Sequence, residues 1–213
     1  GHGDYHVIVL APSTVQESVD LTVLAFDLAE KYRSIVAILT DGSIGQMMEP
    51  CELPPIQPLK TSLPAWAATG AAGRERNVLS SIYLNVNDEE KANLRWMRKW
   101  QEVEANEVRF KEYYTEDAKF LVVGFGSAGR VALSAVRAAR AEGIPVGLLR
   151  PITLAPFPQK KLEELAKRMQ GILVVEMNAG QMLDDVRLAV NGRTPIEFYG
   201  RLGGVVPFPD EIL

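Results

Sequence analysis

The chain of 213 residues is poor in the side chains that bind metal clusters. Cys51 is the one thiol, and histidine occurs twice. A single thiol cannot form an intrachain disulfide or supply the set of thiolates that an iron–sulfur cluster requires. Cys51 lies in a proline-bounded segment without a basic neighbour, so the sequence predicts an unreactive thiol. The scarcity of cysteine indicates a reducing compartment, and we expect a cytoplasmic protein.

Long apolar runs and an excess of positive charge are also missing. No run approaches the roughly 20 residues that span a bilayer, so we expect no membrane segment. The net charge is −4, which argues against nucleic acid as a partner, because phosphate binding needs clustered positive charge. Apolar residues make up 47% of the chain, enough for a real core.

The sequence does contain apolar runs that alternate with helical patterns. One run covers Val7 to Leu10 and another Ile35 to Leu39, and a helical pattern with a possible capping box of Ser13 and Gln16 lies between them. This strand–helix–strand order predicts a parallel crossover. Two strands and one helix cannot close a doubly wound sheet, so we expect most of this first domain to be either missing or supplied by another chain.

The remaining sequence divides into a connection and a second domain. Prolines and small residues fill the first half of the connection, and a charged helical pattern with one apolar stripe follows, which predicts docking onto a neighbour. From Lys119 strands and helices alternate with short loops, which predicts an α/β domain with a largely parallel sheet. The predicted parts are residues 1–48, a connection over 49–118 with a long helix near 88–113, and residues 119–213.

A glycine-rich stretch opens the second domain. Gly124, Gly126 and Gly129 have the spacing G-x-G-x-x-G, in which amides at a helix N-terminus approach a pyrophosphate. A dinucleotide site also needs an acid at the end of the next strand, and that strand ends at Arg150. Arginine there could suit a 2′-phosphate, so an NADP-binding oxidoreductase domain stays an alternative. The favoured interpretation is a strand-to-helix turn in which Gly129 completes the spacing by chance.

Three other stretches carry polar side chains that could serve a site. Asp41 follows the second apolar run, where open sheets bind ligands, although capping of a helix or turn is favoured. The opening GHGDYH alternates two histidines with an aspartate, which is a poor metal site and a possible acid–base pair. Glu176 and Asn178 could bind a polar ligand at a sheet edge, but loop capping is favoured.

Several long stretches of the sequence resemble the same known protein family. They are GHGDYHVIVLAPSTVQESVDLTVLAFDLAEKYR, ILTDGSIGQMMEP, RPITLAPFP, VVEMNAGQMLDDVR and EFYGRLGGVVPFPDEIL. Together they resemble the α-type subunit of 2-oxoacid:ferredoxin oxidoreductases, with the 2-ketoisovalerate (3-methyl-2-oxobutanoate) type as the nearest version. The likeness covers almost the whole chain and is weakest across Thr61–Glu112.

The resemblance implies a fold and an activity. Residues 1–48 would be the second half of a pyrimidine-type thiamine diphosphate-binding domain, and 119–213 a transketolase C-terminal-like domain. The implied enzyme oxidatively decarboxylates a 2-oxo acid to acyl-CoA, with thiamine diphosphate and Mg²⁺ as cofactors and iron–sulfur clusters that pass electrons to ferredoxin. The implied assembly is a hetero-oligomer with a thiamine diphosphate-binding β subunit and smaller subunits, and other parts hold the clusters and CoA.

The resemblance implies no catalytic residue in this chain. The activating glutamate would lie upstream, and the Mg²⁺–diphosphate motif belongs to the β subunit, so we expect the chain alone to be inactive and to bind no cofactor or metal by itself. The residues expected nearest to the cofactor are His2, Asp4, Tyr5 and Asp41. The alternative is a subunit-assembly module, in which the connection and the helix carrying Trp96 and Trp100 pack on partner subunits.

Overall fold

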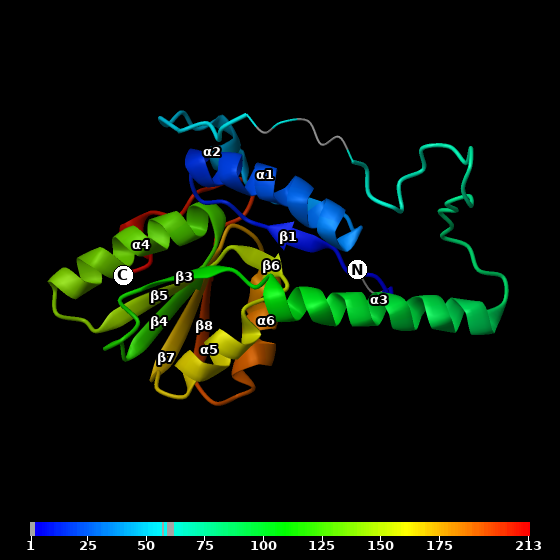
Figure 1. The fold of residues 1–213 in the computed structure, drawn as a ribbon. Coiled ribbons are helices and arrows are strands. Elements are labelled where there is room, and N and C mark those ends of the chain that lie inside the picture. Colours follow the sequence, from blue (N-terminus) through cyan, green and yellow to red (C-terminus); the bar gives the residue numbers. More distant parts are fainter. Residues whose placement is uncertain (1–2, 57, 59–61) are drawn as a thin grey trace.

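The computed structural model describes residues 3–56, 58 and 62–213, whose strands form two sheets (Figure 1). In chain order the elements are β1 (Ile8–Leu10), α1 (Val15–Tyr32), β2 (Val36–Ile38), α2 (Gly42–Gln46), α3 (Val86–Asn106), β3 (Phe110–Tyr113), β4 (Phe120–Gly124), α4 (Gly126–Ala141), β5 (Val146–Pro151), β6 (Thr153–Ala155), α5 (Gln159–Ala166), β7 (Gly171–Glu176), α6 (Gln181–Val190), β8 (Ile196–Gly200) and the 3-10 turn η1 (Pro209–Glu211).

The smaller sheet has the strand order β2-β1-β6. β1 and β2 are parallel and α1 connects them, so the predicted crossover is confirmed. β6 lies more than 140 residues after β1 in the chain and runs antiparallel to it, with Val9 opposite Ala155. Buried side chains of β1 and α1 form one core cluster with Val103 near the end of α3. The first sheet is therefore completed by a strand that the sequence did not predict.

The larger sheet has the order β3-β5-β4-β7-β8, and every neighbouring pair is parallel except β3 with β5. α4 packs on one face, and α5 and α6 pack on the other (Figure 1). The α/β class with a largely parallel sheet is confirmed. The domain limits at residues 48 and 119 stay a prediction.

Two boundaries differ from those predicted. The long helix ends at Asn106 rather than near residue 113, because Glu107 turns its buried carboxylate to α1 and the next residues pair with β5 as strand β3. At α1 the N-cap is Thr14, whose side chain accepts from the amide of Glu17 at 3.1 Å. The capping pair thus lies one residue later than the predicted one.

Residues 49–85, which we call the arm, carry no helix or strand in their described part. The arm runs away from both sheets before α3 returns toward them (Figure 1). Its large apolar side chains are exposed: Leu53, Ile56, Leu63, Trp66, Val78, Leu79, Ile82 and Leu84. In the part of the chain covered by the structure, no helix combines the length and apolarity needed to cross a membrane.

Candidate functional site

The carboxyl ends of β1 and β2 face the start of α4. Open α/β sheets bind their ligands at such an edge, so this edge is where a site is expected. Here three carboxylates from the first part of the chain contact the second domain: Glu17, Asp41 and Glu49. The edge is therefore an interface between the two sheets, held by charge.

Asp41 joins the starts of two helices. Its Oδ1 accepts from the amides of Ser43 and Ile44, each at 3.0 Å, which caps α2. The same carboxylate accepts from Ser127 at the start of α4, from the amide at 2.9 Å and from the hydroxyl at 2.8 Å. A carboxylate at a helix N-terminus also meets a favourable dipole. The favoured capping role of Asp41 is confirmed, and it extends to a second helix.

The glycine loop makes the strand-to-helix turn that the sequence favoured. Gly126 has φ of 57°, and a Cβ there would lie 3.1 Å from Asp41 Oδ2. A Cβ at Gly129 would lie 2.6 Å from the carbonyl oxygen of Gly124, so the third glycine lets α4 lie against β4. The interpretation that Gly129 arises by chance is wrong. The carboxylate of Asp41 stands where a dinucleotide would place its pyrophosphate.

Arg150 is also engaged within the chain. It is 2% exposed, and its guanidinium donates to both carboxylate oxygens of Glu17, at 3.0 and 2.5 Å. Lys111 donates to the same carboxylate at 2.7 Å. Burial would raise the pKa of Glu17, but the hydrogen bonds from Lys111 and Arg150 outweigh it and lower the pKa from 4.5 to about 2. Because both terminal nitrogens of its guanidinium group donate to Glu17, Arg150 is not free to bind a 2′-phosphate.

Glu49 makes the third contact of the interface. Its carboxylate accepts a hydrogen bond from Arg130 Nη2 at 2.5 Å and another from the backbone amide of Val15 at 3.1 Å. The hydrogen bond from Arg130 lowers the pKa of Glu49 below its usual value. Because Arg130 lies on α4, this pair fastens the start of α1 to the second domain.

Glu176 has a structural role as well. It is fully buried at the end of β7, and it accepts from the amides of Met182 and Leu183 at 2.9 Å each and from Asn178 Nδ2 at 2.9 Å. These bonds cap α6 and hold the loop before it. The favoured interpretation of loop capping is confirmed.

Asp4 and Tyr5 lie at the opposite edge of the smaller sheet. They precede β1 and line a cleft of about 690 Å³ with His6, Arg33 and Trp100 among others. His6 stacks on Trp100, with 4.6 Å between ring centroids. His2 lies outside the described residues. The structure thus brings Asp4 and Tyr5 together, at the amino-terminal edge of the smaller sheet. It separates them from Asp41, which follows the carboxyl end of β2 at the opposite edge.

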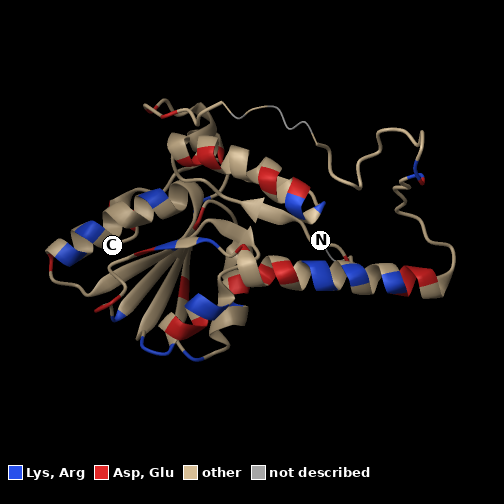
Figure 2. Cartoon of the chain, viewed as in Figure 1, with Lys and Arg blue, Asp and Glu red and all other residues tan. Residues whose placement is uncertain are grey.

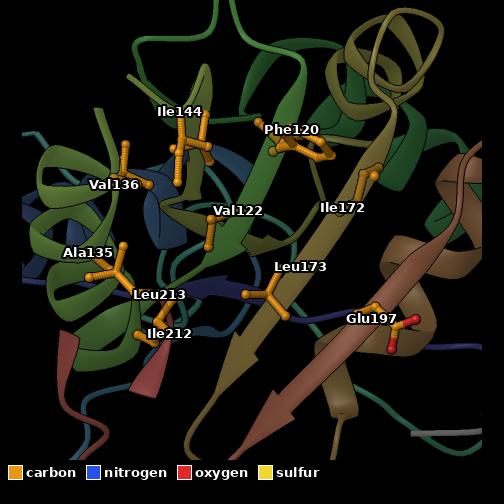
Figure 3. A pocket seen from close by; sticks show the side chains of 14 residues that line it. Phe120, Val122, Ala135, Val136, Ile144, Ile172, Leu173, Glu197, Ile212 and Leu213 are labelled. Carbon is orange, nitrogen blue, oxygen red and sulfur yellow. The ribbon is translucent and has the colours of Figure 1, made fainter. Parts of the chain in front are cut away.

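A second cavity, of about 300 Å³, lies between α4 and the larger sheet. Figure 3 shows Val136 of α4, Val122 of β4 and Leu173 of β7 around it, with Ile212 and Leu213 at one side. Its lining is almost wholly apolar, and Glu197 is the charged residue among the lining side chains. Apart from Glu197, nothing in this lining offers a group for acid–base chemistry.

Sequence reasoning missed most of the interface. The sequence pointed to Asp41 because it follows an apolar run. Glu17, Ser127 and Arg130 belong to helices, and their sequence pattern does not differ from that of an ordinary solvent-exposed polar face. Their partners are between 81 and 133 residues away in sequence. No local pattern predicts such pairs.

The architecture is that of a transketolase-like α/β protein. A solved split-gene transketolase matches 91% of this chain and 48% of its own at a TM-score of 0.50 and 14% identity. The 2-oxoglutarate:ferredoxin oxidoreductase of Magnetococcus marinus, solved with 2-oxoglutarate, coenzyme A and succinyl-CoA bound, matches 100% of this chain and 42% of its own at a TM-score of 0.75 and 22% identity.

Family models narrow this class. The model for "Pyruvate flavodoxin/ferredoxin oxidoreductase, thiamine diP-bdg" matches residues 2–114, and that for "Pyruvate:ferredoxin oxidoreductase core domain II" matches 118–212. The chain belongs to the 2-oxoacid:ferredoxin oxidoreductase family, and the resemblance found in the sequence is confirmed.

Curated relatives agree with this placement. Ketoisovalerate oxidoreductase subunit VorB of Methanothermobacter thermautotrophicus is 46% identical over 96% of this chain and 58% of its own length. 2-Oxoglutarate synthase subunit KorA of Methanothermobacter marburgensis is 33% identical and covers 100% of this chain and 64% of its own length. The chain thus spans about three fifths of the length of these relatives.

The described residues do not fit a complete thiamine diphosphate–Mg²⁺ site. The carboxyl edge of the smaller sheet is filled by the interface, and Asp41 has both oxygens bound to hydrogen-bond donors. Among residues 3–56, 58 and 62–213, no group of three or more His, Cys, Asp or Glu side chains could hold a metal ion. A complete site for the cofactor that names the family model would therefore need further residues in addition to these.

Proposed function

We propose that this chain is part of the α-type subunit of a 2-oxoacid:ferredoxin oxidoreductase whose substrate is a branched-chain 2-oxo acid, 2-ketoisovalerate. The complete complex would release CO₂ from the 2-oxo acid, join the acyl group to CoA as a thioester and pass the electrons to ferredoxin. The observation that carries the proposal is the 46% identity to VorB across nearly the whole chain. The family model for a thiamine diphosphate-binding domain supports the cofactor.

Within that complex the chain would act as a scaffold. Its smaller sheet has three described strands, and it contributes helix caps and ion pairs at the edge where chemistry is expected. We propose the parts 1–48, 49–118 and 119–213 as the units of this scaffold. Asp4 and Tyr5 stay candidates for proximity to the cofactor because they face an open cleft, whereas Asp41 serves the interface.

A substrate scan of the assembled complex tests the activity. Ferredoxin reduction is measured with 2-ketoisovalerate, 2-oxoglutarate and pyruvate, each with CoA and thiamine diphosphate. We expect 2-ketoisovalerate to give the highest kcat/KM, and this chain alone to give no turnover. A preference for 2-oxoglutarate or pyruvate would refute the assignment of 2-ketoisovalerate as the substrate. Turnover by the chain alone would refute its role as a scaffold.

The arm favours a second role, that of an assembly module. Its exposed apolar side chains, such as Ile82 at 73% and Leu63 at 66%, have no cover in the chain as described. Apolar exposure on this scale marks a surface that docks on another protein. If the arm docks on a partner subunit, deletion of residues 62–82 abolishes co-purification with the β subunit and leaves the fold of the two sheets intact. Co-purification that survives the deletion excludes this role.

The NADP alternative has little support in the geometry. The amide of Ser127 at the start of α4 already binds Asp41, and Arg150 already binds Glu17. Calorimetry with NADP and NAD is expected to show no saturable binding at the glycine loop. Saturable binding that is lost in Arg150→Gln would restore the alternative.

A further inference from the structure

A hollow of about 490 Å³ adjoins the cleft of Asp4 and Tyr5. It lies where the end of α1, the middle of α3 and the last part of the arm meet. Its lining consists of Tyr32, Arg33, Val78, Ser80, Tyr83, Arg95, Trp96 and Lys99. We call it the basic hollow, after Arg33, Arg95 and Lys99. In Figure 2, basic residues occupy the middle of α3, between acidic residues toward its two ends.

The three cations of the basic hollow have no acidic partner. Lys99 Nζ donates to the carbonyl oxygen of Arg33 at 3.1 Å, and Arg95 donates to the hydroxyl of Tyr83 at 3.3 Å. No ion pair joins any of the three to a carboxylate of the residues that the structure describes. By contrast, Arg130 and Arg150 at the domain interface both bind glutamates.

Uncompensated charge of this kind is costly where it is partly buried. Lys99 is half-buried, and its burial together with the nearby Arg33 and Arg95 lowers its pKa. Three like charges that converge on one concave surface repel one another unless an anion lies between them. The basic hollow therefore has the electrostatics of an anion site.

The volume of the basic hollow and the other side chains that line it indicate which class of anion it can bind. Guanidinium groups match the oxygens of phosphate, and the hydroxyl of Tyr83, which accepts from Arg95, adds a donor. Trp96, with Tyr83 edge-on at 6.2 Å between ring centroids, offers an aromatic surface beside these groups. A hollow of this volume suits a small molecule rather than a protein segment.

We propose that the basic hollow binds a phosphorylated small molecule, with its phosphate between Arg33, Arg95 and Lys99 and an attached ring against Trp96. The shared chemistry is a phosphate group, which an inorganic anion or a nucleotide can supply. The proposal does not rest on the substrate or the reaction assigned above, because none of these residues has a part in them.

Calorimetry of the purified protein at low salt tests the proposal, with pyrophosphate and ADP as separate probes. We expect one saturable site for each, with affinity that falls as salt rises. Tighter binding of ADP supports the contact of a ring with Trp96, and equal affinities refute that contact. Absence of saturable binding for both probes overturns the proposal.

Variants of α3 locate the site. Lys99→Gln and Arg95→Gln are each expected to weaken binding at least fivefold, which corresponds to about 1 kcal/mol. Arg98→Gln is the matched control, since Arg98 is exposed on the same helix and does not line the hollow. Thermal unfolding of each variant checks the fold. If Arg98→Gln weakens binding as much as the others, the anion binds the charged helix at large and the proposal is wrong.

Discussion

Gly129 shows how one missing methyl group fixes the position of a helix. A Cβ at this residue would lie 2.6 Å from Gly124 O and 3.1 Å from Arg150 Cγ, well inside van der Waals contact. We predict that Gly129→Ala lowers the free energy of unfolding by about 2 kcal/mol, because overpacking outweighs the better helix propensity of alanine. Urea unfolding measures this change.

Gly45→Ala is the control for that experiment. Gly45 is also helical, and nothing lies within 4 Å of a Cβ built there. The free energy of unfolding should stay the same or rise by up to about 1 kcal/mol. Equal effects of the two substitutions would show that α4 does not approach β4 as closely as the structure has it.

Glu17 makes the interface sensitive to acid. Its pKa is about 2 in the folded protein and 4.5 without its partners, so its contribution to stability is complete above pH 4.5. That contribution is lost as the pH falls from 4.5 toward 2, because the unfolded chain takes up the proton first. In Glu17→Gln the group is absent, and we predict lower stability at neutral pH by about 3 kcal/mol.

The pH dependence distinguishes this effect from simple loss of packing. The difference in unfolding free energy between wild type and Glu17→Gln should shrink as the pH is lowered through this window. Urea unfolding at several pH values measures it. A difference that stays constant from neutral pH to pH 3 would contradict the ionic role of Glu17.

Helix α3 is fastened to the body near its C-terminal end. The buried carboxylate of Glu107 accepts from Lys31 Nζ at 2.7 Å and Tyr32 Oη at 2.6 Å, and pairs with Arg109 at 2.8 Å. Burial would raise the pKa of Glu107, but these three partners lower it to about 2. We predict that Glu107→Gln lowers the free energy of unfolding by about 3 kcal/mol and speeds amide exchange in the last turns of α3.

Glu104→Gln is the matched variant on the same helix. Glu104 is exposed and accepts from Trp100 Nε1 at 2.9 Å, so its loss should change stability by less than about 0.5 kcal/mol. Hydrogen exchange and urea unfolding are compared for both variants. If they behave alike, the network around Glu107 does not anchor α3.

At the level of elements, the local sequence pattern predicted where most strands lie but not how distant strands pair. Apolar runs predicted β1 and β2, and the alternation of strands and helices after Lys119 predicted the largely parallel sheet, because a buried strand needs apolar side chains along its length. β6 was missed because it follows β5 after a single residue, Ile152, and its partner β1 lies more than a hundred residues earlier. The predicted helix ran on to residue 113 because Val108 continues its apolar stripe, although pairing with β5 makes Phe110–Tyr113 a strand. The capping roles of Asp41 and Glu176 were favoured correctly, but the partner Ser127 was not predicted.

For the whole molecule, the arm is the segment most open to a protease. Arg74 and Arg76 are exposed there, and no helix or strand protects the described part around them. We predict that trypsin cuts first in the arm and that the two pieces stay together, because β6 pairs with β1 and Glu17 binds Arg150 across the cut. Size exclusion before and after denaturation measures this. Separation of the pieces under native conditions would contradict the pairing, and slower cutting in the assembled complex would support docking of the arm.

The pairing of β6 with β1 also constrains how a gene for this subunit can be divided. The two family models meet between residues 114 and 118, after β3 and before β4. A gene divided there would encode one product that lacks β6 beside β1 and another that lacks β3 beside β5. Each product would expose an unpaired strand edge until it met the other. Functional fission at this point therefore requires that both products be made together and in equal amounts.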